Sequence, residues 1–263
     1  MWSIGQYRSG VEQALDVRRT SLFLPVPGLD ARLDGLTILH LSDLHLDSLA
    51  GIRAAIASAA NGLKPDLCLL TGDYAAHYRR NAVAVVQGMQ EILAGVQARH
   101  GIYLSLGNYD SARLAADIRA EPGWRLLVNE SVTLDHNGAN VSLLGLDDPF
   151  EQAHEPMVAA LAVKTDGFRI VLSHTPDLAA AAAAAGHDLY LCGHTHGGQI
   201  CLPNGRPLIV NTSRPDLARG LWREGGMWGY TTSGAGVSGI PCRHNCPPEV
   251  AMLTLLAGYP TAK

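Results

Sequence analysis

Apolar runs alternate with amphipathic stretches through the first half of the chain. The runs are short and end in glycine or polar residues, which is typical of buried strands, and they lie at residues 37–43, 66–73 and 101–108. The stretches between them repeat their apolar residues with helical spacing and predict helices at residues 48–63, 80–98 and 111–120. Strands that alternate with helices in this way favour a largely parallel sheet.

The second half of the chain is richer in strands. Strand patterns occur at residues 125–128, 131–135, 141–145, 168–174 and 188–194. An alanine-rich stretch at 178–186 predicts a helix that ends at Gly186, because glycine is favoured just past a helix C-terminus. Further strand patterns, interrupted by glycine and proline, lie at 199–202, 207–210, 228–232 and 249–256. This layout predicts an α/β fold in which two sheets pack face to face with helices outside.

No internal repeat or low-complexity linker divides the sequence. We therefore expect one domain over residues 1–263, in which residues 1–35 form an N-terminal extension and a lead-in strand. Helical spacing near the start is shared by Trp2, Ile4, Tyr7, Val11 and Leu15, with Arg8, Arg18 and Arg19 nearby. Such a helix could pack on the body of the protein, which is the simpler interpretation, or rest on a membrane surface.

Composition narrows the classes of function. The 263 residues are 47% hydrophobic and 17% charged, with a net charge of −4, so no basic stripe is available to neutralise nucleic-acid phosphates and no specific nucleic-acid partner is expected. The chain has no apolar stretch of transmembrane length and no secretory signal pattern. We expect a soluble, cytoplasmic protein, with peripheral contact to the inner membrane as the alternative.

The cysteines do not predict a disulfide framework, because their number, five, is odd. Cys68 and Cys192 lie in apolar runs and should be inert core residues. Cys242 and Cys246 could bridge each other or join His244 on a metal, but that spacing is a weak signal. A solvated loop with free thiols is the simpler expectation there.

Potential metal ligands follow five of the apolar runs. They are two aspartates, one asparagine and four of the eleven histidines, namely Asp43, His45, Asp73, Asn108, His174, His194 and His196. Because sites in α/β sheets form beyond the carboxyl ends of strands, these side chains should converge. Each alone could be a helix cap, a turn residue or a core histidine. Capping does not explain why four histidines accompany the acids, so the set predicts a metal site.

The ligand types indicate which metals suit this site. Nitrogen and oxygen ligands without thiolate favour Mn²⁺, Fe or Zn²⁺ over Ca²⁺ or Mg²⁺. Seven ligands exceed the number that one tetrahedral ion uses. Two divalent ions about 3.5–4 Å apart, bridged by one carboxylate, fit this number and form a clamp for phosphoryl transfer.

The motifs Asp-x-His, Gly-Asp, Gly-Asn-x-Asp, His and Gly-His-Thr-His, over about residues 36–196, closely resemble those of the calcineurin-like metallophosphoesterases. The tail from Gly193 onward resembles a bacterial phosphodiesterase subgroup typified by YkuE and YaeI. Members of that subgroup are associated with membranes or cell envelopes, and some resemble UDP-diacylglucosamine pyrophosphatases. The resemblance implies a four-layer α/β/β/α sandwich.

The same resemblance implies a role for each ligand. One metal ion would be held by Asp43, His45 and His196. The other ion would be held by Asn108, His174 and His194, with Asp73 bridging the two. A hydroxide that bridges the ions would attack phosphorus in line, and the ions and His194 would hold the other phosphoryl oxygens.

The residue that follows Asn108 departs from the family pattern, and this departure also affects the acid after it. Most members carry a histidine next, which protonates the leaving oxygen and is steadied by the following acid. This chain has Tyr109, whose phenol has a reference pKa of about 10 and is a poor proton donor at neutral pH, followed by Asp110. Without an imidazole partner, Asp110 could simply cap the helix that begins near Ser111.

The lack of a proton donor limits which leaving groups the substrate can have. General acid catalysis is worth about 10²–10⁴-fold, so we expect phosphodiester or pyrophosphate bonds with good leaving groups rather than alkyl monoesters. Two alternatives remain open: Tyr109 only shapes the pocket, or His77 supplies the proton.

Residues that contact substrate are harder to find in the sequence. Candidates to grip a phosphate are Arg79, Arg80, Arg206, Arg214 and Arg219, some of them in the segment 211–221. Trp222, Met227 and Trp228 could form an apolar wall for a lipid or base, or a satellite core cluster. The expected substrate is a small phosphate ester, a nucleotide-sugar or a lipid-linked compound. The leading hypothesis is a dinuclear metal-dependent phosphoesterase; the alternatives are a phosphomonoesterase of broad specificity and a metal-bearing scaffold without catalysis.

Overall fold

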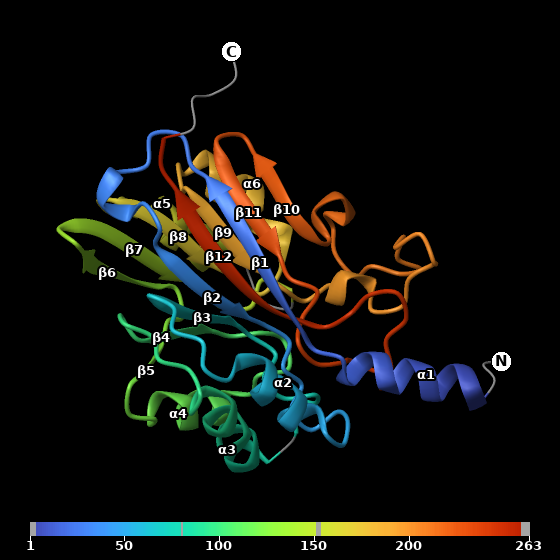
Figure 1. Ribbon diagram of the computed structural model, residues 1–263. Coiled ribbons are helices and arrows are strands. Elements are labelled where there is room, and N and C mark those ends of the chain that lie inside the picture. The colour runs from blue at the N-terminus through green and yellow to red at the C-terminus, as the bar shows by residue number, and fades with distance from the viewer. Residues whose placement is uncertain (1–3, 80, 151–153, 259–263) are drawn as a thin grey trace.

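The computed structural model describes residues 4–79, 81–150 and 154–258. Two sheets face each other, and helices cover the outer side of each (Figure 1). The first sheet has the order β1-β12-β2-β3-β4-β5, with β1 Arg18–Pro25, β12 Glu249–Leu256, β2 Thr37–Leu41, β3 Leu67–Thr71, β4 Ile102–Ser105 and β5 Trp124–Leu126. The second has the order β10-β11-β9-β8-β7-β6, with β10 Gly220–Glu224, β11 Met227–Thr231, β9 Leu189–Cys192, β8 Phe168–Leu172, β7 Ala139–Gly145 and β6 Glu130–His136. The predicted α/β/β/α sandwich is confirmed.

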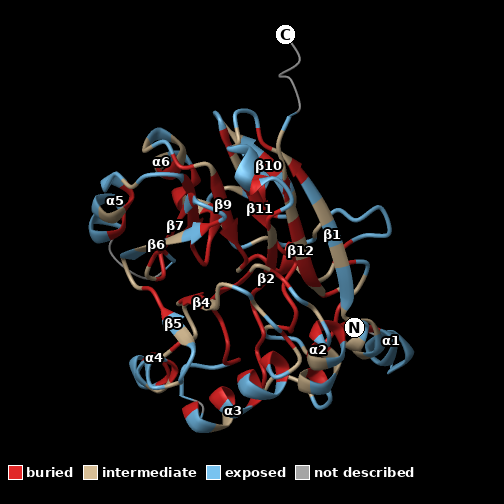
Figure 2. Cartoon of the chain, turned by 60° about the vertical axis from the view of Figure 1, so that its left-hand side comes forward, coloured by how far each residue is buried: buried red, intermediate tan, exposed pale blue. Residues whose placement is uncertain are grey.

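Three apolar layers hold the sheets and helices together. In β3, Leu69 belongs to the layer between the sheets, whereas Cys68 and Leu70 belong to the layer under the helices of the first sheet. In β9, Leu191 lies between the sheets and Cys192 lies under the helices of the second sheet. These central strands are buried along their length (Figure 2). Because both faces of each strand are covered, the runs are apolar throughout rather than alternating.

Helices form the two outer layers. The first sheet is covered by α2 Ile52–Ala60, α3 Ala82–Leu93 and α4 Ala112–Arg119, and the second by α5 Glu155–Ala162 and α6 Ala179–Ala184. The predicted end of the alanine-rich helix is confirmed, since Gly186 has a left-handed φ of 81°. The sequence pattern does not predict α5, because apolar residues lie on its buried face (Met157) and also on its exposed face (Val158, 45% exposed).

Two expectations for the last third of the chain are wrong. The strands predicted at 199–202 and 207–210 are reduced to isolated bridges, because glycine, proline and a left-handed Gln199 (φ 53°) interrupt them. The apolar wall predicted from three side chains also fails. Trp222 and Met227 belong to the core under the helices of the second sheet, and the Trp228 indole N–H donates to a backbone carbonyl of β1 at 2.9 Å. The alternative, a core cluster, is confirmed.

The N-terminal helix α1, Ile4–Leu15, packs on the body through its second half. Gly10 and Ala14 are buried, and the carbonyl of Gly10 accepts a hydrogen bond from the amide of Arg243 at 2.8 Å. The first half projects from the body (Figure 1), and Ile4 is 90% exposed. Trp2 lies outside the described residues. The packed helix is thus confirmed for its second half, whereas contact with a membrane stays a prediction. None of the described helices has the length and apolar character needed to cross a membrane.

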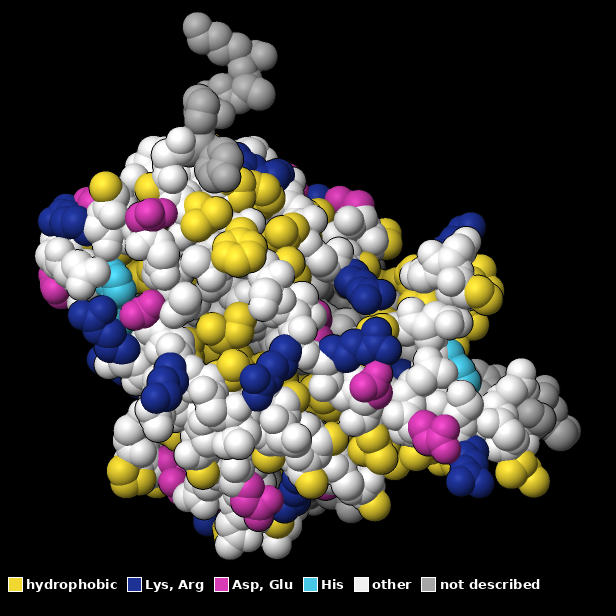
Figure 3. Space-filling model, in the orientation of Figure 1, with side chains coloured by type: hydrophobic (Ala, Val, Ile, Leu, Met, Phe, Trp, Pro, Cys, Tyr) yellow, Lys and Arg dark blue, Asp and Glu magenta, His cyan; other side chains and the backbone are white. Residues whose placement is uncertain are grey.

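The five cysteines are all free and buried. Cys68 and Cys192 are core residues, as predicted, and burial raises the pKa of the Cys68 thiol to about 12. The solvated loop expected at Cys242 and Cys246 is wrong, because both side chains are fully buried and Gly10 of α1 packs directly on Cys242. On the face drawn in Figure 3, charged side chains of both signs are scattered among apolar ones.

Candidate metal centre

The centre lies where the loops after β2, β3 and β4 of the first sheet meet the loops after β8 and β9 of the second. The amide of Asp43 donates to the carbonyl of Gly72 at 3.0 Å, and the amide of His45 donates to the carbonyl of Asp73 at 3.1 Å. Gly72 has a φ of 90°, and a side chain there would overlap the backbone of Gly107 in the next loop. Only glycine permits this approach, so Gly72 allows the loops after β3 and β4 to touch.

Five of the predicted ligand residues have a left-handed backbone although they are not glycine. Their φ angles lie between 40° and 67°, and the residues are Asp43, His45, Asp73, His194 and His196. Such conformations cost about 1–3 kcal/mol each and gather at functional sites. Here they turn the side chains out of the strand direction and toward one common space.

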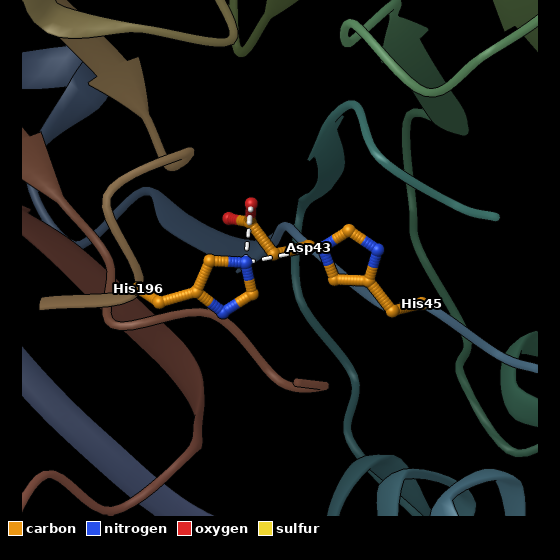
Figure 4. A group of neighbouring side chains, drawn as sticks. All are labelled: Asp43, His45 and His196. Carbon is orange, nitrogen blue, oxygen red and sulfur yellow. Dashed lines mark hydrogen bonds and ion pairs between the residues drawn. The ribbon is translucent and has the colours of Figure 1, made fainter. Parts of the chain in front are cut away.

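A first group of ligand atoms comes from Asp43, His45 and His196, which are all buried (Figure 4). Their ligand atoms lie within 4.8 Å of one another. The Nε2 atoms of the two histidines are 3.0 Å apart, and His196 Nε2 is 3.4 Å from Asp43 Oδ1. His45 Nδ1 donates to the carbonyl of Ala75 at 2.9 Å, which leaves the lone pair of His45 Nε2 directed into the group.

A second group adjoins the first and shares Asp43 with it. Asp43, Asp73 and His174 also place ligand atoms within 4.8 Å of one another. His174 Nδ1 donates to the carbonyl of Thr71 at 2.8 Å, so its Nε2 faces Asp73 Oδ2 at 3.3 Å. Burial alone would lower the pKa of His174, but the Asp73 carboxylate raises it to about 10. The same Asp73 oxygen is 3.6 Å from His45 Nε2, and thus lies between the two groups.

Two buried polar atoms at this place have no hydrogen-bond partner within the described part of the chain. They are Asn108 Oδ1 and His194 Nε2. His194 Nδ1 lies 3.2 Å from His174 Nε2, so His194 borders the second group. Buried polar atoms are almost always paired in proteins, and an unpaired acceptor needs an explanation such as a cation. The structure therefore brings together all seven residues that the strand-end pattern selected.

A cavity of about 520 Å³ opens from these residues. One wall is polar and includes Asp73, Asn108 and His194. The rest of the lining includes an apolar wall made by Phe150, Ile200, Leu208, Ile209 and Ile240. No pattern in the sequence predicts this apolar wall, because its members come from three irregular segments.

Comparison with protein families matches residues 36–198 to the calcineurin-like phosphoesterases. The chain belongs to this family. It is therefore a metallophosphoesterase, a hydrolase that uses divalent metal ions. The chain is similar to the metallophosphoesterase YkoQ of Bacillus subtilis, with 28% identity over 231 residues that cover 85% of this chain and 84% of YkoQ. It is 31% identical to the phosphodiesterase YaeI of Escherichia coli over 228 residues, which cover 83% of this chain and 82% of YaeI.

A third relative of this metallophosphoesterase is LpxG of Chlamydia trachomatis, named as a UDP-2,3-diacylglucosamine pyrophosphatase. It is 26% identical over an alignment 304 positions long, which covers 91% of this chain and 89% of LpxG. In all three comparisons the similarity extends well beyond the strand-end motifs.

Asp110 does not cap a helix, contrary to the simple expectation. The cap of α4 is Ser111, whose hydroxyl accepts from the amide of Leu114 at 3.2 Å. The buried Asp110 carboxylate instead accepts three backbone hydrogen bonds, from Asp73 at 2.8 Å and from Gly107 and Tyr74 at 2.9 Å each. It therefore ties the loop after β3 to the loop after β4.

Tyr109 lines the polar side of the cavity and is partly buried. Its amide donates to Asp73 Oδ1 at 2.9 Å, which holds that oxygen and leaves Asp73 Oδ2 for the two ligand groups. The phenol ring meets the His45 and His77 rings edge-on, with centroids 5.7 Å and 6.4 Å away. His77 is exposed. Whether either side chain delivers a proton stays a prediction.

The arginines chosen as phosphate contacts do not reach the cavity. Four of them are described and none lines it: Arg79, Arg206, Arg214 and Arg219. Arg80 lies outside the described residues. Arg214 is engaged elsewhere, since it pairs with Asp216 and Glu224 at 2.8 Å each. The segment 211–221 contributes only Asn211 to the cavity wall.

The sequence does not reveal Arg243, which contacts the candidate ligand His196 and the backbone around it. This arginine is fully buried, and no carboxylate pairs with it in the described chain. Its guanidinium donates to the carbonyls of Gly236 (2.6 Å), Ser233 (2.7 Å), Cys246 (3.2 Å) and His196 (3.3 Å). It also lies 3.2 Å from His196 Nδ1. Only the three-dimensional arrangement reveals this role, since an arginine between two cysteines has no distinctive spacing.

Replacing Arg243 tests this support. We expect Arg243→Met to lower the free energy of unfolding by about 3 kcal/mol or more, because several buried carbonyls lose their donor at once. Arg223→Met is the matched control. Arg223 is exposed and stacks on Trp228 at 4.4 Å, so its loss should cost no more than about 1 kcal/mol. Urea unfolding of the metal-free proteins measures both values, and equal values would contradict the role of Arg243.

Proposed function

We propose that this metallophosphoesterase hydrolyses phosphodiester or pyrophosphate bonds at a centre of two divalent metal ions. The observation that carries the proposal is the position of Asp73 Oδ2 between two groups of ligand atoms, 3.6 Å from His45 Nε2 and 3.3 Å from His174 Nε2. The unpaired buried atoms of Asn108 and His194 extend the second group. A single ion would leave part of this donor set without a partner.

The donor set fits two ions. Under this proposal one ion is held by Asp43, His45 and His196. The other is held by Asn108, His174 and His194, and Asp73 is shared. Imidazole and oxygen donors without thiolate suit Mn²⁺, Fe or Zn²⁺. When bound, such ions lower the pKa of a coordinated water and draw charge from phosphoryl oxygens.

Residues of the chain keep these donors in place before any ion binds. The carbonyls of Ala75 and Thr71 accept from the Nδ1 atoms of His45 and His174, so that Nε2 of each ring is the nitrogen directed into the site. His174 Nε2 would bind an ion after losing its proton. On the leaving-group side, Tyr109 offers a phenol that can donate a hydrogen bond but is a weak acid. This arrangement favours bonds whose leaving group needs little protonation, such as a pyrophosphate linkage.

The variant Asn108→Ala tests whether the protein is an enzyme or a metal-bearing scaffold without catalysis. We expect it to lower kcat/KM for bis(p-nitrophenyl) phosphate with Mn²⁺ by at least about 100-fold, because a direct ligand matters more than the outer partners whose loss costs about 10–100-fold. Bound Mn²⁺ per chain should fall in parallel. Asn204→Ala, at an exposed turn, is the control and should leave both values unchanged. Undiminished turnover in Asn108→Ala would contradict the proposal, and no turnover in the unmodified protein would favour a scaffold.

Tyr109 can be tested with phosphodiesters that differ only in the pKa of the leaving group. We expect kcat/KM to fall steeply as that pKa rises, and Tyr109→His to recover about 10²-fold or more for the poorest leaving groups. Tyr109→Phe keeps the ring, removes the hydroxyl and should behave like the unmodified protein. A shallow dependence in the unmodified protein would mean that Tyr109 or His77 already supplies the proton, and alkyl phosphates would return as substrates.

The apolar wall favours a substrate that carries an apolar group next to its phosphate. Leu208, Ile209 and Ile240 are 58%, 80% and 54% exposed, although they line the same cavity as the metal ligands. The ring of Phe150 lies 4.4 Å from that of His194, so the apolar wall begins beside the metal centre. The relative LpxG bears a name that specifies a diacylated nucleotide-sugar. We therefore include an acyl or comparable apolar group in the proposed substrate class.

Substituting the wall tests this part of the proposal. The unmodified protein should prefer a hexyl over a methyl p-nitrophenyl phosphodiester, and Ile209→Ser or Ile240→Ser should reduce this preference by about 3- to 10-fold, because buried apolar contact is lost. The control is Leu202→Ser, which changes a 42% exposed leucine that does not line the cavity. Equal kcat/KM values for the two substrates would refute the apolar group and leave the metal mechanism untouched.

A further inference from the structure

A second cluster of potential ligands lies at the far end of the sheets from the candidate metal centre. Asp66 precedes β3 and His100 precedes β4, so both stand at the amino ends of strands whose carboxyl ends form the centre. The third member, His136, is the last residue of β6 in the other sheet. Their ligand atoms lie within 4.8 Å of one another. The cluster therefore joins the two sheets at one corner of the sandwich.

The nitrogens of the two imidazoles are already about as far apart as two nitrogens that bind the same metal ion. His100 Nε2 and His136 Nδ1 are 2.9 Å apart, and their rings are inclined by 63°. Two nitrogens bound to one ion at about 2.0–2.1 Å each would lie about 3 Å apart. Binding would thus replace one hydrogen bond between the rings by two bonds to the ion, with little movement of either side chain.

The carboxylate is oriented in advance. Asp66 Oδ2 accepts from the amide of Thr37 at 2.9 Å and from its hydroxyl at 2.8 Å, which leaves Asp66 Oδ1 for a ligand. The amide of His100 donates to the carbonyl of Asp66 at 2.8 Å, so these two residues are fixed to each other through the backbone. His136 is only 4% exposed and is held by its pairing with Ala139. Such support of ligands by their neighbours is typical of metal sites.

The surroundings of His100 disfavour a proton on its imidazole. Burial, and then the nearby His136 and Arg99, lower the pKa of His100, so this ring is neutral near pH 7 and offers a lone pair. Arg99 Nη1 is the nearest guanidinium atom, 3.8 Å from Asp66 Oδ1. The carboxylates of Asp66 and Asp135 oppose it, since both act on His100 as negative charges.

We propose that Asp66, His100 and His136 form a second metal site, separate from the phosphoesterase centre, that takes one Zn²⁺ ion. Two imidazoles and one carboxylate are a set that suits Zn²⁺, with water as the fourth ligand, whereas Mg²⁺ and Ca²⁺ prefer oxygen alone. The ion would connect the amino ends of β3 and β4 to the end of β6. Its role is to stabilise the contact between the sheets, because an ion that binds only the folded protein raises its stability.

The test compares Zn²⁺ binding by the unmodified protein with that of His100→Asn, in which the phosphoesterase centre is intact. Equilibrium dialysis should show one Zn²⁺ fewer per chain in the variant. Zn²⁺ should raise the melting temperature of the unmodified protein by about 5 °C more than that of the variant when free Zn²⁺ is about 100 times the dissociation constant. Phosphodiesterase activity should be the same in both proteins, which separates this site from the proposed function.

A second variant and a control complete the test. His136→Asn removes the other imidazole and should lose the same single Zn²⁺. His154→Asn changes an exposed histidine outside both clusters and should bind as much Zn²⁺ as the unmodified protein. Equal Zn²⁺ content in the unmodified protein and in His100→Asn would overturn the proposal, as would an equal loss in His154→Asn.

Discussion

The contact between the loops after β2, β3 and β4 is the constraint on which the rest of the molecule depends. Gly72 and Gly107 let two backbones touch, and the Asp110 carboxylate holds the two loops together through three amides. Two aspartates are thereby buried in one small space, Asp43 and Asp73. Burial raises the pKa of Asp43, and His174 opposes this by carrying a proton when no metal is bound. The backbone strain and the buried charge together form a site that a cation stabilises.

The stability of the three apolar layers offsets the strain of this site. Strands β3 and β9 are covered on both faces, so their ends are held firmly while the loops beyond them adopt left-handed conformations. The cavity has two parts of different origin. Its polar groups stand at the ends of strands, whereas its apolar wall comes from irregular segments. A substrate with a charged phosphate and an apolar group would span both parts.

The sequence was most informative where a local pattern determines position. A buried strand that ends in Asp, Asn or His specifies both the fold and the place of its last side chain, which is why the structure gathers all the predicted ligands. Asp110 and Arg243 were misjudged or missed because their partners are backbone groups of other loops, which no spacing reveals. Trp222 illustrates another limit. The sequence pattern predicts no strand at this residue, and an apolar side chain there fits a cavity wall and a core equally well until its neighbours are known. His100 and His136 come together only because two separate sheets meet at their corner.

The position of β12 between β1 and β2 in the first sheet has a consequence for how the protein is made. This strand separates β1 from β2, yet Thr20 of β1 and Glu249 of β12, whose side chains are hydrogen-bonded, are 229 positions apart in the chain. A ribosome that adds about 5–20 residues per second needs on the order of ten seconds or more to cover that distance. Throughout this time β1 and β2 have unpaired edges, which are prone to pair with other chains. Until β12 enters the sheet, the nascent chain therefore exposes strand edges that the finished fold covers.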